Sequence, residues 1–367
     1  MVLEDDIRGM VWNLFQLLIP KKFLGVDIGT SFVKIAEISR FGNRKKLENY
    51  GFMPASVLYD KKFRTFEKST LLLSSKDIAK AIVAIMEEAQ VKTRQVIFSI
   101  PDFSTFFTNF ELPSMSKEEL QQAVRYEARQ HVPLPLGEVT LDWQVIEGRT
   151  TDERKTNLKI LLVAVPNEVI NQYREIADLA NLELFALEAE AFSLLRGIIS
   201  EDEKKNVAII DIGAQSTTCN IVEKKVLKIS HSFDMGGNEF AKIISKGLNL
   251  EYPQAREFKQ KYGISGEREE VKQVLLPLID MILMEVQKIF DNFYRQGGKE
   301  VEKVILAGGV ALLPGLKEYF AENLKKETEI ANPFSSLFYP PILESTLGKI
   351  GPSYAIAVGA ALRGLEF

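Results

Sequence analysis

The chain has 367 residues and a mass of 41.4 kDa, with 46% hydrophobic and 26% charged residues. This balance excludes disorder and collagen-like structure, and it indicates two to three domains with a buried core. The 46 Lys and Arg against 50 Asp and Glu give a net charge of −4, so no overall basic field attracts nucleic acid. One cysteine and two histidines exclude a disulfide framework, a Cys-rich zinc site and an HExxH motif. No apolar run approaches the roughly 20 residues that span a bilayer, so we expect a soluble, cytosolic protein.

Residues 1–22 are predicted to form a separate N-terminal amphipathic segment. Its apolar residues recur at helical spacing and form one stripe: Ile7, Met10, Val11, Leu14 and Leu18. One interpretation is a helix that packs on the protein or on a neighbour. The other is a short membrane anchor, with Lys21 and Lys22 near the headgroups. The acidic start of the segment opposes anionic lipid and favours the first interpretation.

A β-hairpin with a polar tip is predicted next. An apolar strand from Phe23 leads into Asp27-Ile28-Gly29-Thr30-Ser31, and a second strand follows through Val33 and Ile38. Lys34 lies in that second strand, five residues after Gly29. Taken alone, such a turn is typical of an ordinary hairpin, with the aspartate stabilising the turn and the lysine solvated.

The same pattern returns in the second half of the chain. An apolar strand from Val207 leads into Asp211-Ile212-Gly213, and polar residues follow before a second strand through Ile221: Gln215, Ser216, Thr217 and Thr218. Glycine lets backbone N–H groups approach an anion, and hydroxyls add donors. Asp27 and Asp211 suit Mg²⁺ bound through water, since Mg²⁺ retains several waters. The duplication therefore predicts two turns, one from each half of the chain, that grip one triphosphate.

Two further segments suit a nucleotide site. A buried strand from Val304 ends in Gly308-Gly309, and paired glycines there let a flat ligand lie on the backbone. The alternative is a tight strand–helix turn. Residues 353–364 are predicted to form a small-residue helix, whose first explanation is close packing.

These segments resemble, in order and spacing, the ATPase superfamily that contains actin, the heat-shock chaperone ATPase domain and hexokinase. The matching segments are the two phosphate turns, two connecting helices and an adenosine turn: 27–31, 188–198, 211–218, 306–309 and 353–364. Gly236 and Gly237 resemble the glycine pair that follows the second phosphate turn. Lys259 matches an adenosine-side lysine, whereas Arg256 stands where that motif has a glutamate. The resemblance implies an α/β, actin-like (ribonuclease H-like) two-lobe ATPase fold.

The segment between the two phosphate turns narrows the resemblance. Strands over 95–101 and 106–112, a helix capped by Ser116, and strands over 140–146 and 159–165 predict an inserted α+β subdomain. This stretch is similar to the PilM family of pilus-assembly proteins, in the runs 111–148, 159–196 and 211–222. The opening FLGVDIGTSFVKIAEIS is of the same kind, except that Phe32 replaces a usual serine. The predicted division is a lobe I core of 23–95, 166–205 and 345–367, an inserted subdomain of 96–165, and a lobe II of 206–344.

The resemblance implies a layout like that of the cell-division protein FtsA, with ATP and Mg²⁺ as cofactors. It further implies a cytoplasmic adaptor at the inner-membrane platform of the type IV pilus or a related secretion system, peripheral through its partners. Those partners are the N-terminal cytoplasmic tail of a PilN-like membrane protein and other platform and motor proteins. The residues around 98–112 and 124–126 are the predicted lining of the tail groove.

Hydrolysis needs a residue that orients the attacking water. Glu188 and Glu190 are the candidates, and their alternative role is solvated helix surface. We expect at most a slow ATPase. Two other functions stay open, a small-molecule kinase of the same superfamily and an FtsA-like filament-forming scaffold. The kinase would need a catalytic aspartate and a polar acceptor pocket, for which the sequence shows no distinct motif.

Overall fold

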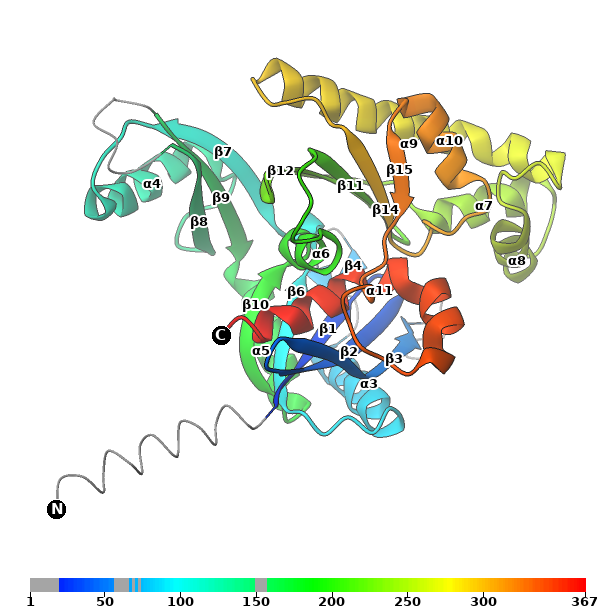
Figure 1. Ribbon diagram of the computed structural model, residues 1–367, viewed down its shortest axis with the longest axis horizontal. Helices are drawn as coiled ribbons and strands as arrows, with labels where there is room; N and C mark the ends of the chain where they lie inside the picture. The colour runs from blue at the N-terminus through cyan, green and yellow to red at the C-terminus, as the bar shows by residue number, and fades with distance from the viewer. Residues whose placement is uncertain (1–19, 56–65, 68–69, 72–73, 149–156) are drawn as a thin grey trace.

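The computed structural model describes residues 20–55, 66–67, 70–71, 74–148 and 157–367 (Figure 1). The apolar stripe predicted within residues 1–22, from Ile7 to Leu18, lies wholly outside these ranges, and only residues 20–22 of that segment are described. Lys21 and Lys22 already belong to the first strand of the sheet. No helix within the described ranges is both long and apolar enough to cross a bilayer.

The first lobe is built on a five-stranded sheet in the order β10-β6-β1-β2-β3. Its strands are β1 (Lys21–Ile28), β2 (Phe32–Phe41), β3 (Arg44–Pro54), β6 (Gln95–Ile100) and β10 (Glu183–Ala189). The first three are antiparallel, and β6 and β10 continue the sheet in parallel. Helices α3 (Ser75–Glu88) and α5 (Asn167–Leu179) bury one face, and α11 (Glu344–Gly364) buries the other. The short strands β4 (Phe66–Glu67) and β5 (Thr70–Leu71) pair with each other.

The second lobe repeats this topology with the order β13-β12-β11-β14-β15. Its strands are β11 (Val207–Ile212), β12 (Thr217–Glu223), β13 (Val226–Phe233), β14 (Lys303–Ala307) and β15 (Glu327–Ile330). One face is covered by α7 (Gly237–Gly247), α8 (Tyr252–Tyr262), α9 (Glu269–Arg295) and α10 (Leu316–Leu324). Each lobe thus starts with a hairpin followed by parallel strands, which places the two predicted phosphate turns at equivalent positions.

Two helices lie between the sheets. α6 (Glu190–Ile198) and α11 pack against the second face of the lobe II sheet through Leu194, Ala355 and Ile356. The small residues predicted over 353–364 allow this approach: a Cβ on Gly359 would lie 1.7 Å from the carbonyl oxygen of Ser193. Packing is therefore a sufficient reason for this composition.

The inserted subdomain is a three-stranded antiparallel sheet in the order β7-β9-β8, covered by one helix. Its elements are β7 (Phe106–Leu112), α4 (Lys117–His131), β8 (Val139–Glu147) and β9 (Leu158–Pro166). The predicted capping box is present, since the Glu119 N–H donates to the Ser116 hydroxyl and the Ser116 N–H to the Glu119 carboxylate.

Two predicted boundaries need correction. Residues 96–100, assigned to the insertion, form β6, which pairs with β1 and β10 in the lobe I sheet, so the insertion starts after Ile100. The end of the predicted lobe II also belongs with lobe I. Phe334 and Leu337 pack in the core under α11, and Phe338 exchanges backbone hydrogen bonds with Lys45 and Leu47 of β3. The short helices η1 (Asp102–Ser104) and η2 (Pro341–Leu343) lie at these junctions.

Candidate functional site

The first predicted phosphate turn closes the β1–β2 hairpin. The Gly29 N–H donates to the Phe32 carbonyl oxygen at 3.0 Å, which makes a tight turn. Asp27 and Lys34 are paired across the hairpin, and Lys34 Nζ lies 2.7 Å from Asp27 Oδ2. Asp27 is buried, and its Oδ1 has no hydrogen-bond partner among the described residues. A buried carboxylate oxygen without a partner is expensive, so this atom indicates a place for a ligand, a water or an ion.

The second turn reproduces this geometry. The Gly213 N–H donates to the Ser216 carbonyl oxygen at 2.9 Å, and Asp211 occupies the position of Asp27 at the end of its strand. Gln215 lies at the tip, where its side-chain oxygen is buried without a partner among the described residues. Thr217 differs from the prediction in one respect, because its hydroxyl donates to the Met235 carbonyl oxygen at 2.7 Å and thus serves the lobe's own backbone.

Gly236 and Gly237 pack against the backbone of the second turn. The Gly237 N–H donates to the Gly213 carbonyl oxygen at 2.9 Å. A Cβ on Gly236 would lie 2.8 Å from backbone atoms of Ala214 and Gln215, so only glycine fits against the turn. The predicted glycine pair is therefore part of the site's framework.

The charged groups of the two turns act on one another across the lobes. Burial would lower the pKa of Lys34, but Asp27, followed by Asp211 and Glu190, raises it above its ordinary value. Burial raises the pKa of Asp211 to about 6, against the opposing effect of Lys34. Asp27 and Lys34 come from lobe I and Asp211 from lobe II, so the structure brings the two turns together.

The adenosine-side residues gather around the end of β14. Gly308 has a left-handed φ of 85°, and a Cβ there would lie 2.3 Å from Asp211 Oδ1. Its N–H donates to the Pro352 carbonyl oxygen in α11, whereas nothing lies within 4 Å of a Cβ on Gly309. The predicted glycine pair thus joins the second phosphate turn to an open backbone surface.

Lys259, on α8, reaches the same region. Its Nζ donates to the Gly237 carbonyl oxygen at 3.1 Å. Burial, with a smaller effect of Arg256, lowers its pKa to about 8. The lysine ammonium has three donors, and one of them now binds a backbone carbonyl. The same group could donate instead to an anionic or ribose oxygen of a ligand.

The two candidate glutamates separate clearly. Glu190 is half-buried at the start of α6, and its pKa is raised by desolvation and then by the nearby Asp27, Asp102 and Asp211. Glu188 instead forms a two-point ion pair with Arg196, at 2.6 and 2.9 Å, and accepts a hydrogen bond from Ser193. The structure therefore keeps Glu190 in the candidate site and turns Glu188 away from it. Neither residue lies on fully solvated helix surface, because both are half-buried.

The sequence interpretation missed Asp102. It follows β6 and is buried beside Glu190: the Asp102 N–H donates to Glu190 Oε2 at 3.4 Å, and the Ala191 N–H donates to Asp102 Oδ1 at 3.1 Å. Burial raises the pKa of Asp102 to about 7. The signal that was available is its place at the carboxyl end of a buried strand parallel to β1, the edge where α/β sheets hold ligands.

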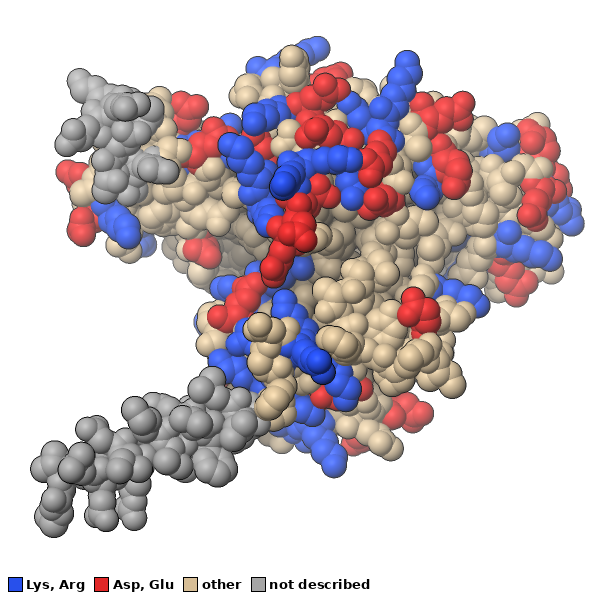
Figure 2. Space-filling view, viewed as in Figure 1, with Lys and Arg blue, Asp and Glu red and all other residues tan. Residues whose placement is uncertain are grey.

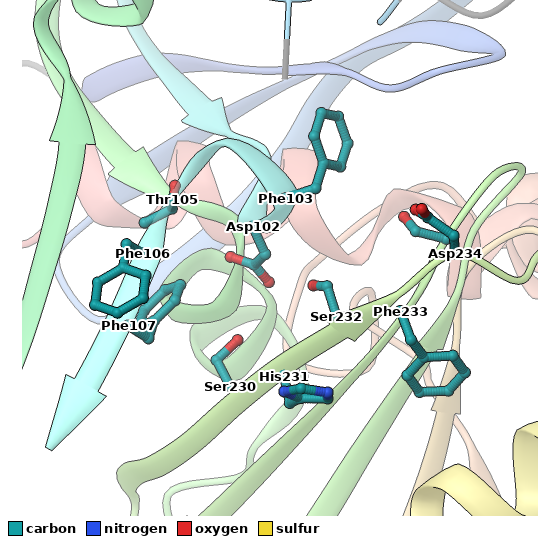
Figure 3. Close-up of a pocket in the computed structure, with 11 residues that line it drawn as sticks. Asp102, Phe103, Thr105, Phe106, Phe107, Ser230, His231, Ser232, Phe233 and Asp234 are labelled. Atoms are coloured by element: carbon teal, nitrogen blue, oxygen red, sulfur yellow. The ribbon is translucent and has the colours of Figure 1, made fainter. Parts of the chain in front are cut away.

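A pocket of about 370 Å³ adjoins these groups (Figure 3). It lies between the start of β7 and strand β13, and the Asp102 side chain points into it towards Ser230 and Ser232. Ser216, from the second turn, also lines it, so the pocket continues from the phosphate turns. Aromatic rings form much of the remaining wall: Phe103, Phe106, Phe107 and Phe233.

Magnesium fits these residues only through water. Within the described residues no three acidic, His or Cys side chains converge closely enough to ligate a metal directly. Asp27 and Asp211 nevertheless act on each other electrostatically, and Asp27 presents a buried oxygen without a partner among the described residues. Such carboxylates suit the hydration shell of Mg²⁺, which would neutralise charge on bound phosphates.

The duplicated sheets and the paired turns between the lobes define an actin-like protein of the ATPase superfamily. The chain belongs to the family described as type IV pilus assembly protein PilM, whose model matches residues 25–365. Among solved structures, it is similar to a PilM–PilN type IV pilus biogenesis complex, with 24% identity, a TM-score of 0.81 and coverage of 94% of this chain and 98% of that one. It is also similar to MreB 5 of Spiroplasma citri bound to AMPPNP, with 14% identity, a TM-score of 0.54 and coverage of 93% and 95%.

Among characterised sequences, the chain is similar to the cell division protein FtsA of Enterococcus faecalis. The two are 23% identical over 353 residues, which cover 83% of this chain and 78% of that protein. The predicted family, fold class and FtsA relationship are thereby confirmed.

Proposed function

We propose that the protein is an ATP-binding, actin-like adaptor of the type IV pilus or a related secretion system. The observation that carries the proposal is the pair of matched turns, in which Asp27 and Lys34 of lobe I act on Asp211 of lobe II. Gly29, Thr30, Ser31 and the equivalent residues Gly213, Gln215 and Ser216 would supply phosphate contacts. The structural neighbour bound to AMPPNP supports a nucleotide in this fold.

In this proposal, different residues would contact the phosphates, the hydrated Mg²⁺ and the nucleoside of Mg-ATP. Lys34 offers a positive charge to the phosphates, although Asp27 now occupies it at 2.7 Å. Asp27 and Asp211 would orient water on Mg²⁺, and Gly308 and Gly309 with Lys259 would hold the nucleoside side. Glu190 is the candidate for orienting an attacking water. Burial raises its pKa well above the usual value, so its charged form is disfavoured, which supports at most slow hydrolysis.

The proposed partner is the N-terminal cytoplasmic tail of a PilN-like membrane protein. The similar solved complex contains PilM together with PilN, which supports this partner. Capture of the tail, with contacts to other platform and motor proteins, would hold the adaptor at the cytoplasmic face of the inner membrane. The proposed groove lies beside β7 and α4, where an extended peptide would combine main-chain hydrogen bonds with apolar pockets. Phe98 and Val124, which the sequence placed in its lining, are buried in the cores of lobe I and of the inserted subdomain, so they do not contribute to it.

Isothermal titration calorimetry tests both halves of the proposal. The pure full-length chain is titrated with Mg-ATP, then with a synthetic tail peptide in the presence and absence of nucleotide. Saturable binding of both ligands is expected. Absence of nucleotide binding in Mg²⁺ would overturn the assignment of the site, and absence of peptide binding would overturn the adaptor role alone.

A small-molecule kinase is the second candidate, and one observation favours it. The sequence showed no catalytic aspartate or acceptor pocket, whereas the structure places Asp102 in a polar pocket that continues from Ser216. A screen of hydroxylated metabolites coupled to ADP release separates the two functions. Substrate-dependent ADP formation that is lost in Asp102→Asn would favour the kinase. An FtsA-like scaffold would instead show nucleotide-dependent light scattering from polymers.

A further inference from the structure

One end of the lobe I sheet carries a concentration of positive charge. The start of β1 and the turn between β2 and β3 bring together six cationic side chains, here called the basic edge: Lys21, Lys22, Arg40, Arg44, Lys45 and Lys46. The strand register makes three of them direct neighbours, because Lys21 pairs with Arg40 and Arg40 with Lys45. In the view of Figure 2, blue side chains gather where the chain enters the described structure.

Negative charge at the basic edge is scarce. Glu48 lies 2.7 Å from Lys46 and 3.6 Å from Lys22. Within the part of the chain that the structure describes, no carboxylate pairs with Lys21, Arg40, Arg44 or Lys45. Six cations against one carboxylate leave this end of the sheet with an excess of positive charge, which favours an anionic partner.

Exposed aromatic rings accompany these charges. Phe41 and Phe338 are 55% and 58% exposed, and the Arg44 guanidinium lies 5.5 Å from the centre of the Phe338 ring. Cations interspersed with exposed apolar rings suit a surface that is anionic outside and apolar beneath, as at the headgroup layer of a membrane. A soluble acidic peptide would use the charges but leave the rings in water.

The basic edge is also placed so that it does not compete with nucleotide. β1 begins at Lys21 in the basic edge and ends near Asp27 of the first phosphate turn. Asp27 follows Lys21 by six positions along the strand, which separates the two by about 20 Å. The sequence before Lys21 carries the apolar stripe described above, so the chain enters the fold through this same end.

We propose that the basic edge is a membrane-facing surface that binds anionic phospholipid headgroups directly, with the phosphate turns directed away from the bilayer. The contact goes beyond the proposed capture of a partner's tail. It adds an orientation to the adaptor, because a tail alone tethers a protein but leaves it free to rotate.

Vesicle co-sedimentation of the full-length chain tests the proposal. The probes are vesicles of phosphatidylcholine alone and of phosphatidylcholine with phosphatidylglycerol. The test variant reverses three charges of the basic edge, R44E/K45E/K46E, and the matched control reverses three lysines of lobe II, K246E/K261E/K317E. The two variants change the net charge by the same amount but on different surfaces.

The parent and the control are expected to bind the anionic vesicles in a salt-sensitive manner. The test variant is expected to lose at least about a hundredfold in partition coefficient, since each cation near an anionic surface contributes about a factor of five. Phe41→Ser should weaken binding further without changing its salt dependence. Circular dichroism and Mg-ATP titration establish that every variant is folded and that the nucleotide site is intact.

Equal binding by the parent and the test variant would overturn the proposal, as would a parent that ignores anionic vesicles. Binding of polyglutamate or of a single-stranded oligonucleotide in place of vesicles would overturn it as well, and would assign the surface to an acidic protein or to nucleic acid. These outcomes are independent of the Mg-ATP titration, so failure of this proposal and failure of the nucleotide assignment are distinguishable.

Discussion

At the scale of single residues, the carboxylates of the candidate site differ in what their substitution is expected to change. Asp27 is half of a buried ion pair and also presents a buried oxygen without a partner among the described residues. Asp27→Asn and Asp211→Asn are each expected to raise the dissociation constant for Mg-ATP at least about tenfold, equal to about 1.4 kcal/mol. Calorimetry measures the change, with the exposed Asp291→Asn as control. A variant that binds like the parent would remove that aspartate from the site.

Asp102 gives a prediction about pH. Its folded pKa of about 7 exceeds the ordinary value of 3.8, so the folded state holds a proton that the unfolded state has released between these values. Stability therefore falls as pH rises through this window. Asp102→Asn, permanently neutral, should be more stable than the parent at pH 8 and about equal to it near pH 4. Thermal unfolding of parent and variant at the two pH values measures this difference. If Asp102→Asn is less stable than the parent by the same amount at both, the role of Asp102 is merely structural.

At the scale of elements, one strand joins lobe II to the inserted subdomain. Lys228 of β13 is buried, and its Nζ donates to the Ile146 carbonyl oxygen at 3.1 Å and to Glu147 at 2.7 Å. Asn109 of β7 donates to the Lys228 carbonyl oxygen at 2.6 Å. These bonds are the means by which a movement of lobe II would reach the subdomain proposed to hold the partner's tail.

Lys228→Met keeps the length of the side chain but removes its bonds across this contact. The expected result is faster amide exchange in β8 and β13 and a loss of about 1–3 kcal/mol in stability. The exposed Lys224→Met serves as the control. A double-mutant cycle with Asn109→Ala should show coupling above about 0.5 kcal/mol, and strict additivity would mean that the two bonds act independently.

The elements also show which features could be predicted from the sequence and which could not. The two phosphate hairpins were predictable because an apolar strand, Asp-x-Gly and a second strand are adjacent in the chain. β6 was misassigned, since its pairing with β1 joins residues about 70 positions apart. Likewise, Glu188 is distinguished from Glu190 by its bonds to Ser193 and Arg196, and Asp102 enters the site through its contact with Ala191, far along the chain. Local patterns predicted the turns, while long-range pairing decided which acids accompany them.

At the scale of the whole molecule, the proposed nucleotide bridges two lobes that otherwise meet through α6, α11 and the Lys228 contact. A ligand that binds only the folded state stabilises it according to its concentration relative to its dissociation constant. At a concentration of about 1,000 times that constant, Mg-ATP should add about 4 kcal/mol to the free energy of unfolding. Differential scanning calorimetry should show a higher midpoint, and excess EDTA should remove most of the increase if, as proposed, Asp27 and Asp211 hold the phosphates with the help of hydrated Mg²⁺.

Gly308→Ala provides the matched test of this bridging. Its added Cβ would collide with Asp211 Oδ1 and with the backbone of Ile212, so the second turn must shift away from the first. The variant is expected to lose most of the Mg-ATP-dependent rise in the unfolding midpoint. Gly297→Ala, a positive-φ glycine with nothing near its Cβ, carries similar backbone strain at a remote position and should keep the rise. A full nucleotide response in Gly308→Ala would show that the lobes close without the two turns meeting.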